Sequence, residues 1–232
     1  MNRNPLFGTV ILLAASLTAN ASPKDDLASA AKQLADKPNY GWTATVADPS
    51  SPFPMGPTQG KTEKGGVTHV TMSFGENSFE IALKGTGGAV KGQEGWQSIE
   101  EVGQAEGPGR FLAMMARSTK TPAATATELA GATTELKLVD GAYAGDLTAD
   151  GVKAQLNFGG GPGGEGPAIA NPKGAVKFWV KDGVLVKFEF KLQAAMNFNG
   201  NDMNIDRTTT IEIKDVGTTK IELPADAKKK LP

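Results

Sequence analysis

The clearest pattern in the chain lies in residues 174–192, where apolar and charged side chains alternate on either side of Asp182-Gly183. Alternation with a period of two predicts β-strands, and an Asp-Gly pair between two such runs predicts a hairpin. A three-residue loop, 181–183, pairs Phe178 with Val186 and leaves one face free of lysines. We therefore expect that register, with this buried face: Val176, Phe178, Val180, Val184, Val186, Phe188 and Phe190. It leaves Trp179 exposed on the lysine face, opposite Leu185.

Similar alternation recurs in residues 40–46, 70–83, 135–147 and 209–213, which indicates further antiparallel strands. In the second of these, a loop at 75–78 would pair Phe74 with Phe79 and Met72 with Ile81. The glycine-rich residues 85–104 predict short, curved strands, and residues 220–223 a last short strand.

Helical spacing is found near the N-terminus and in the middle of the chain. Residues 24–36 carry one apolar stripe of Leu27, Ala30, Ala31 and Leu34, with Ser22 as the N-cap and Pro23 at the first helical position. Shorter helices are expected after Gly107-Pro108, after Thr121-Pro122 and after Thr148. The fold class predicted is α+β, a large curved antiparallel sheet (an unclosed β-barrel) covered on its concave side by helices.

Three polar or breaker-rich stretches predict loops. Residues 47–57 hold four prolines, which excludes a central strand. Residues 159–172 hold six glycines and three prolines, which is typical of a loop without packed structure. Residues 199–206 are rich in asparagine and aspartate and predict a polar turn.

The first 21 residues have the layout of a secretory signal. Arg3 precedes an apolar run, residues 6–17, and Ala19-Asn20-Ala21 is a small-residue cleavage site. The run is too short to cross a membrane as a helix, and none of comparable length follows it. We expect residues 1–21 to be removed, residues 22–232 to form one half-barrel domain without a transmembrane segment, and the protein to be periplasmic or secreted.

The composition narrows the possible chemistry. The chain has no cysteine, which excludes disulfides, thiolate metal sites and a cysteine nucleophile, as well as the acceptor residue of a bacterial lipoprotein. The formal net charge of −1 becomes one unit more negative once Arg3 is removed, so no nucleic-acid partner is expected.

The order of the predicted helices and strands, together with several short sequence stretches, resembles that of a known family. An N-terminal helix leads to Asn39-Tyr40-Gly41-Trp42, hairpins follow up to Val176 through Gly183, and Pro224-Ala225-Asp226-Ala227 comes after the last strands. This arrangement resembles the periplasmic lipoprotein-carrier (Lol-type) superfamily and the mycobacterial glycolipid carriers similar to it. The resemblance implies a half-barrel with a helical lid around a hydrophobic cavity. No arginine on a strand stands out as a ligand-release residue of that family. Residues 199–220 resemble uncharacterised exported proteins of Gram-negative bacteria, which implies no function.

Catalysis finds little support in the sequence. His69 is the single histidine and is expected to be a solvated strand residue on the face opposite Val70. Nucleophile-elbow and phosphate-loop spacings are absent from the sequence. The asparagine and aspartate side chains of residues 199–206 offer the oxygen ligands that calcium prefers, but they do not have the spacing of an EF-hand loop. A tight turn explains these residue types better. We expect no catalytic residue, metal or cofactor.

Aromatic and methionine side chains are the remaining candidates for a site. They would line a cavity for a lipid or other hydrophobic small molecule, because flexible thioethers and aromatic rings suit acyl chains. The predicted ligand-binding residues are Trp42, Phe74, Phe79, Phe111, Met114, Met115, Phe178, Phe188 and Phe190. The alternative is that they fill a core, which would make the protein a structural or interaction module of the cell envelope with an unknown protein partner.

Overall fold

The computed structural model describes residues 22–50, 56–75, 77–92, 94–104, 107–156, 168–198 and 201–232. The strands are β1 (Asn39–Ala47), β2 (Thr58–Glu63), β3 (Val67–Phe74), β4 (Asn77–Lys84), β5 (Gly87–Gly92), β6 (Gly95–Ser98), β7 (Lys137–Val139), β8 (Ala142–Asp146), β9 (Ala168–Lys181), β10 (Val184–Phe198) and β11 (Asn201–Lys214). The helices are α1 (Pro23–Ala35), α2 (Ile99–Gln104), α3 (Pro108–Ser118), α4 (Pro122–Gly131), α5 (Ala149–Leu156) and α6 (Ala225–Lys230).

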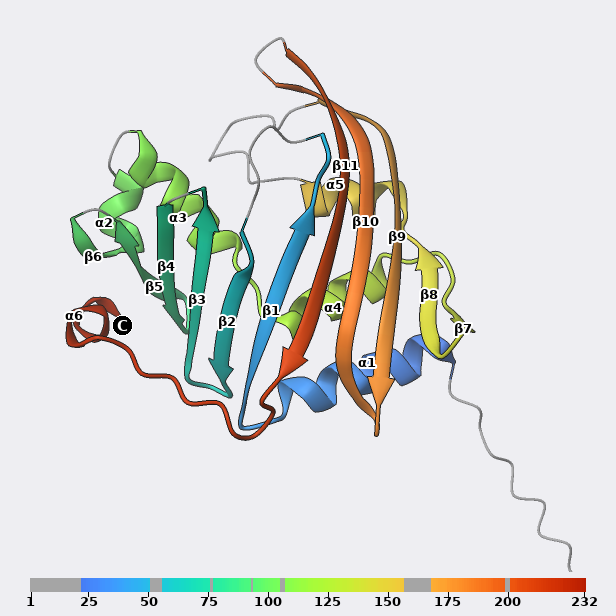
Figure 1. Ribbon diagram of the computed structural model, residues 1–232, viewed down its shortest axis with the longest axis horizontal. Coiled ribbons are helices and arrows are strands. Elements are labelled where there is room, and N and C mark those ends of the chain that lie inside the picture. Colours follow the sequence, from blue (N-terminus) through green and yellow to red (C-terminus); the bar gives the residue numbers. More distant parts are fainter. Residues whose placement is uncertain are drawn as a thin grey trace, which may run out of the picture.

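The eleven strands of the described residues form one antiparallel sheet in the order β6-β5-β4-β3-β2-β1-β11-β10-β9-β8-β7 (Figure 1). The last long strand, β11, pairs with the first, β1, so segments from the two ends of the chain meet at the centre of the sheet. The sheet is curved and unclosed, with β6 and β7 as its edges. This confirms the predicted α+β class and half-barrel architecture.

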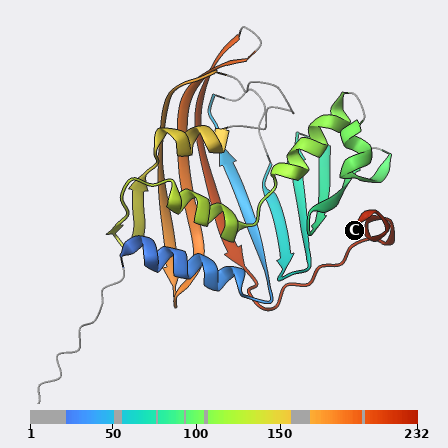
Figure 2. The same cartoon turned by 180° about the vertical axis from the view of Figure 1, so that it is seen from behind.

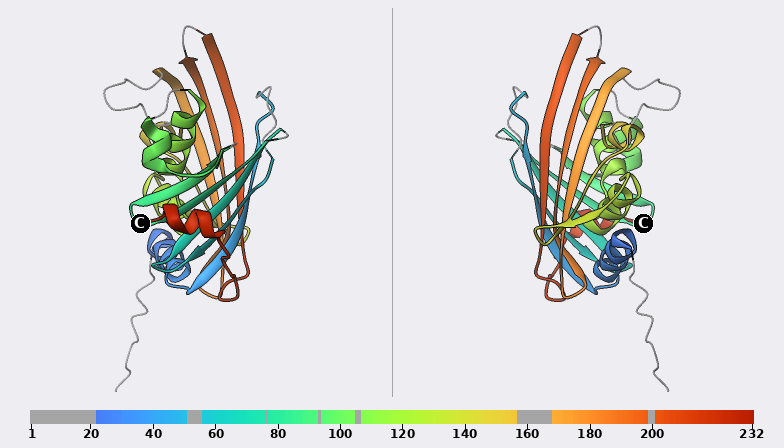
Figure 3. Two further views of the ribbon diagram at one scale, coloured as in Figure 1. Left: turned by 90° about the vertical axis from the view of Figure 1, so that its left-hand side faces the viewer. Right: turned by 90° about the vertical axis from the view of Figure 1, so that its right-hand side faces the viewer.

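Helices cover the concave face of the sheet (Figures 2 and 3). Helix α1 packs on β10 and α4, and α5 packs on β9. The apolar stripe predicted for α1 is wholly buried, and Ser22 and Asp25 form a reciprocal capping box at its first turn. Strand side chains and all four of α1, α3, α4 and α5 contribute to the main hydrophobic core. Within the described residues, every helix is too short or too polar to cross a membrane.

A second, smaller core lies on the other, outer face of the sheet. After β11 the chain crosses this face and ends in α6, beside β5 and β6 (Figure 1). Leu223 and Ala227 pack there against Ala82. The Nζ of Lys230 lies 2.8 Å from Oε1 of Glu101 and anchors the end of α6. Residues 220–223 are not a strand, contrary to the prediction, because they cross the strands instead of pairing along an edge.

The hairpin of β9 and β10 has a different register from the one predicted. Asp182 and Gly183 have φ values of 52° and 75° and form a two-residue turn that matches the twist of the strands. Leu185 then pairs with Val180 and Lys187 with Trp179, so the register shifts at Val186, a β-bulge.

The bulge restores one apolar face despite the two-residue turn. Phe188 therefore lies opposite Phe178, and the predicted pairing of Phe178 with Val186 is wrong. Of the predicted face, Val176, Phe178, Phe188 and Phe190 are buried, while Val180, Val184 and Val186 are half-buried; Leu185 is buried instead. Trp179 is half-buried rather than exposed and lies under Lys187, whose Nζ is 5.2 Å from the ring centroid.

The hairpin of β3 and β4 also departs from its predicted register. Phe74 pairs with Asn77 and Met72 with Phe79, not Phe74 with Phe79 and Met72 with Ile81. The difference is two positions, so every side chain keeps its predicted face, and Val70 and Ile81 are buried.

Three loop or strand boundaries also differ from prediction. Residues 201–206 belong to β11 rather than to a polar turn, because the long ladder with β10 continues to the pair Phe198–Asn201. Residues 168–172 belong to β9, so the glycine-rich loop is shorter, and residues 99–104 form α2 rather than a strand. The predicted signal segment, most of the glycine-rich loop and residues 51–55 lie outside the described residues.

Candidate functional site

Four of the predicted ligand-binding residues lie in the packed core. Trp42 and Phe190 are 4% and 7% exposed, and Phe178 and Phe188 are 0% exposed. The rings of Phe178 and Phe188 are 5.9 Å apart, and those of Phe188 and Phe190 are stacked at 6.4 Å. All four belong to the main hydrophobic core of the described residues, and a part in ligand binding stays a prediction for them.

The other predicted residues lie toward the periphery of the core. Phe79, Met114 and Met115 are half-buried, whereas Phe111 is 53% exposed on α3. The side chain of Phe74 lies outside the described residues. The structure therefore leaves Phe111 at the surface and covers Phe79 and the two methionines only in part. Their part in ligand binding stays a prediction.

Half-buried apolar side chains gather at one end of the concave face. There β1 and β3 end, β9 and β11 begin, and α3 and α5 flank the sheet, while α1 and α4 cover the opposite half (Figure 2). We name five of these side chains, each packed against the main core, the apolar rim: Ala44, Met72, Leu112, Ile169 and Ile205. Two of the five are neighbours of residues predicted for the site: Leu112 follows Phe111 in the chain, and Met72 pairs with Phe79. The period-two pattern could have found Met72 and Ile205, which share a face with buried neighbours.

Arg207 is a cation at the same end of the sheet that the sequence did not single out. It lies on β11 opposite the buried Leu192, so its side chain starts on the concave face. Burial lowers the pKa of the Arg207 guanidinium from its usual value, and the nearby carboxylate of Asp48, just past β1, acts against that shift. Extending the alternation of Thr209, Ile211 and Ile213 backwards would have placed Arg207 on this face.

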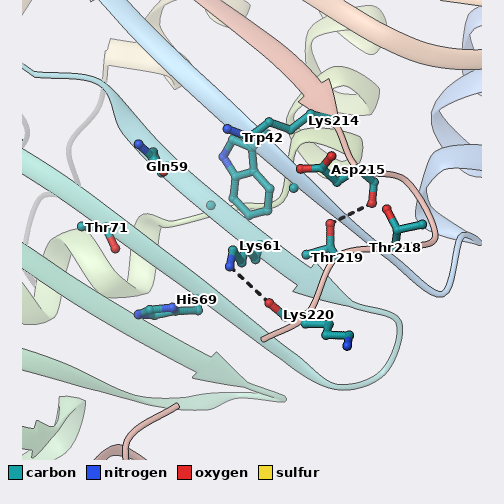
Figure 4. A pocket seen from close by; sticks show the side chains of 12 residues that line it. Trp42, Gln59, Lys61, His69, Thr71, Lys214, Asp215, Thr218, Thr219 and Lys220 are labelled. Atoms are coloured by element: carbon teal, nitrogen blue, oxygen red, sulfur yellow. Dashed lines mark hydrogen bonds between the residues drawn. The ribbon is translucent and has the colours of Figure 1, made fainter. Parts of the chain in front are cut away.

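A groove of about 560 Å³ lies on the outer side of the sheet (Figure 4). Strands β1, β2 and β3 form its floor, and the chain following β11 forms one wall. Its lining residues are Gly41, Trp42, Gln59, Gly60, Lys61, His69, Thr71, Lys214, Asp215, Thr218, Thr219 and Lys220. The sequence did not predict this groove, because it depends on where residues 215–220 cross the sheet.

His69 at the border of the groove is more shielded than predicted. It lies on the face opposite Val70, as expected, but its side chain is only 18% exposed. Its Nε2 is 3.1 Å from Oε2 of Glu80, whose Oε1 accepts a hydrogen bond from Lys91 at 2.6 Å. Burial raises the pKa of Glu80, but Lys91 and His69 outweigh it and hold the pKa below its ordinary value of 4.5. His69 is thus a paired residue rather than a solvated one.

The oxygen-rich residues 201–206 belong to strand β11 rather than to a loop. They lie in an extended strand, and the carboxylate of Asp206 pairs with Lys191 at 2.9 Å. In the part of the chain that the structure describes, no three histidine, aspartate or glutamate side chains are grouped to hold a metal ion.

No known protein family and no curated protein matches this sequence. Among solved structures, LprF from Mycobacterium bovis is similar at 12% identity and a TM-score of 0.47, over 89% of this chain and 100% of that one. A LolA superfamily protein from Nitrosomonas europaea is similar at 12% identity and a TM-score of 0.35, over 87% of this chain and 96% of that one. Both similarities accord with the resemblance stated from the sequence. The fold of this chain is given by its own sheet order.

Proposed function

We propose that the protein binds the apolar part of a lipid or another hydrophobic small molecule at the apolar rim, without catalysing a reaction. The supporting observation is that half-buried apolar side chains from the sheet and from α3, the five of the apolar rim, lie against the main core at this end of the concave face. Covering such surface contributes about 25 cal/mol per Å² to binding.

The chemistry of the rim suits an acyl chain. Met72 of the rim is half-buried and flexible, as are Met114 and Met115 on α3, the helix that carries Leu112, so these side chains can adapt to chains of different shape. Arg207 and Asp48 supply charged groups at the same end, as in apolar pockets where a few polar groups orient the ligand. The buried rings of Phe178 and Phe188 would support this wall from below rather than touch the ligand.

Titration of residues 22–232 with a dansyl-labelled fatty acid tests the proposal. We expect a saturable rise in dansyl fluorescence, and a loss of at least about tenfold in affinity for Met72→Asp, which places a charge on the rim. Leu138→Asp is the matched control, since Leu138 is 64% exposed on the edge strand β7. Absence of saturable binding, or equal affinity in all three proteins, would contradict the proposal.

A second candidate function is a protein-interaction module of the cell envelope. The tight packing around Phe178 and Phe188 favours it, as do Leu138 and Val139, which are exposed on the edge strand β7. Under this hypothesis the fatty acid does not bind, and Leu138→Asp abolishes the capture of a reproducible partner. In either case we propose export to the periplasm or the exterior, on the signal-like residues 1–21.

A further inference from the structure

The outer groove lies on the opposite side of the sheet from the apolar rim and is built differently. Its volume of about 560 Å³ falls in the range of small-molecule sites. Most of its lining side chains are polar or charged, in contrast to the rim. A ligand in this groove must therefore be recognised by hydrogen bonds and charge.

The wall of the groove is held in place by backbone hydrogen bonds. The amide of Gly217 donates to the carbonyl of Asn39 at 2.8 Å, and the amide of Thr219 donates to that of Asp215 at 3.1 Å. Thr219 is buried, and its hydroxyl donates to the same Asp215 carbonyl at 2.8 Å. Lys61 donates from Nζ to the carbonyl of Lys220 at 3.2 Å. The groove is thus preformed between the sheet and a tethered segment, which lowers the entropic cost of binding.

The charge of the lining is positive. The lining contains three lysines, at 61, 214 and 220, and one carboxylate, that of Asp215. The side chain of Lys214 runs along β1, where its Nζ donates to the hydroxyl of Thr43 at 2.9 Å. Figure 4 shows Lys61 and Lys214 on different sides of the groove, with Gln59, Thr71 and His69 along a third side. This arrangement offers several hydrogen-bond donors around one space.

We propose that this groove binds a small organic anion, whose carboxylate or phosphate group is held by Lys61 and Lys214. Charge-assisted hydrogen bonds from two ammonium groups favour an anion, and the hydroxyl and amide groups of Thr71 and Gln59 complete its polar contacts. A metal cation fits poorly, because Asp215 is the only carboxylate of the lining. A purely apolar ligand would remove water from the lysine ammonium groups without offering them a negative charge in return.

His69 gives a direct readout, because the sequence contains a single histidine and hence one imidazole Hε1 resonance. We expect titration with citrate, and separately with glycerol phosphate, to shift this resonance along a saturable curve for at least one probe. The two titrations distinguish a carboxylate site from a phosphate site. A linear, non-saturating shift with both probes would overturn the proposal.

Matched variants separate binding in the groove from general charge effects. The double variant Lys61→Met, Lys214→Met should lower the affinity for the probe by at least about tenfold, whereas Lys153→Met on α5 should leave that affinity unchanged. Lys61→Arg, Lys214→Arg keeps both charges and should retain saturable binding, which excludes loss of the wall as the cause. Equal affinity in the double methionine variant and the parent would refute the assignment. Fatty-acid binding at the rim is measured in the same proteins, so the two proposals can fail independently.

Discussion

Phe188 lies directly across from Phe178 in the ladder of β9 and β10, and the two rings are 5.9 Å apart. Both side chains are 0% exposed, and both belong to the core that α1, α4 and α5 share with the sheet. The pair exists because Val186 bulges out of the ladder and shifts the register by one residue. The packing of the long hairpin against the helices is centred on these two rings.

Truncation of this pair should cost much of the stability of the fold. Phe188→Ala removes a fully buried ring and leaves a cavity, so we expect the free energy of unfolding to fall by about 3–5 kcal/mol. Chemical denaturation followed by circular dichroism measures it. Leu138→Ala, at an exposed position, should change the value by less than about 0.5 kcal/mol. A small loss for Phe188→Ala would show that the ring is not part of a tightly packed core.

Gly60 should tolerate no side chain, because the indole of Trp42 crosses β2 at this residue. A Cβ at Gly60 would lie 2.0 Å from Cζ2 of Trp42, well inside contact distance. We expect Gly60→Ala to lower the free energy of unfolding by about 1–3 kcal/mol and to shift the tryptophan emission spectrum. Gly131→Ala is the control: nothing lies within 4 Å of its added Cβ, and alanine is the better helix former in α4. If Gly60→Ala and Gly131→Ala had equal free energies of unfolding, the Trp42 indole would not lie against Gly60.

The carboxylate of Glu80 should make a pH-dependent contribution to stability. Its pKa in the folded protein lies below the ordinary value of 4.5, so the contribution is present in full above that value. It is lost as the pH falls through the folded-state pKa. The stability difference between the parent and Glu80→Gln should therefore shrink on acidification below pH 4.5, measured by denaturation at a series of pH values. Glu222→Gln, on the exposed C-terminal segment, should show no such trend. A stability difference between the parent and Glu80→Gln that grows as the pH falls would contradict the pairing of Glu80 with Lys91 and His69.

Which residues share a face could be predicted from the sequence far better than which residues pair. The period-two pattern placed Val176, Phe178, Phe188 and Phe190 together correctly, because that pattern does not depend on the turn. The pairing depended on the φ angles at Asp182-Gly183 and on the bulge at Val186, neither of which hydrophobicity encodes. In the β3–β4 hairpin the predicted register was wrong by two positions, and because side chains alternate with a period of two, each one still lies on its predicted face.

The candidate sites were less accessible to sequence reasoning than the fold. Four of the aromatic residues predicted to line a cavity lie in the core, whereas rim positions such as Ile205 were not among the predicted residues. Burial at one end of a sheet depends on where α3 and α5 lie, which is a long-range property. The outer groove depends on the path of residues 215–220 across three strands, for which the local pattern gives no signal.

Extraction and mass spectrometry of the protein, purified under non-denaturing conditions from the cells that make it, tests binding of an apolar ligand most directly. The proposal predicts a lipid or other apolar molecule in stoichiometric amount with the parent protein, and its loss in Met72→Asp but not in Leu138→Asp. A parent protein that yields no such molecule, and whose concave end proves fully packed in a crystal structure, would contradict it.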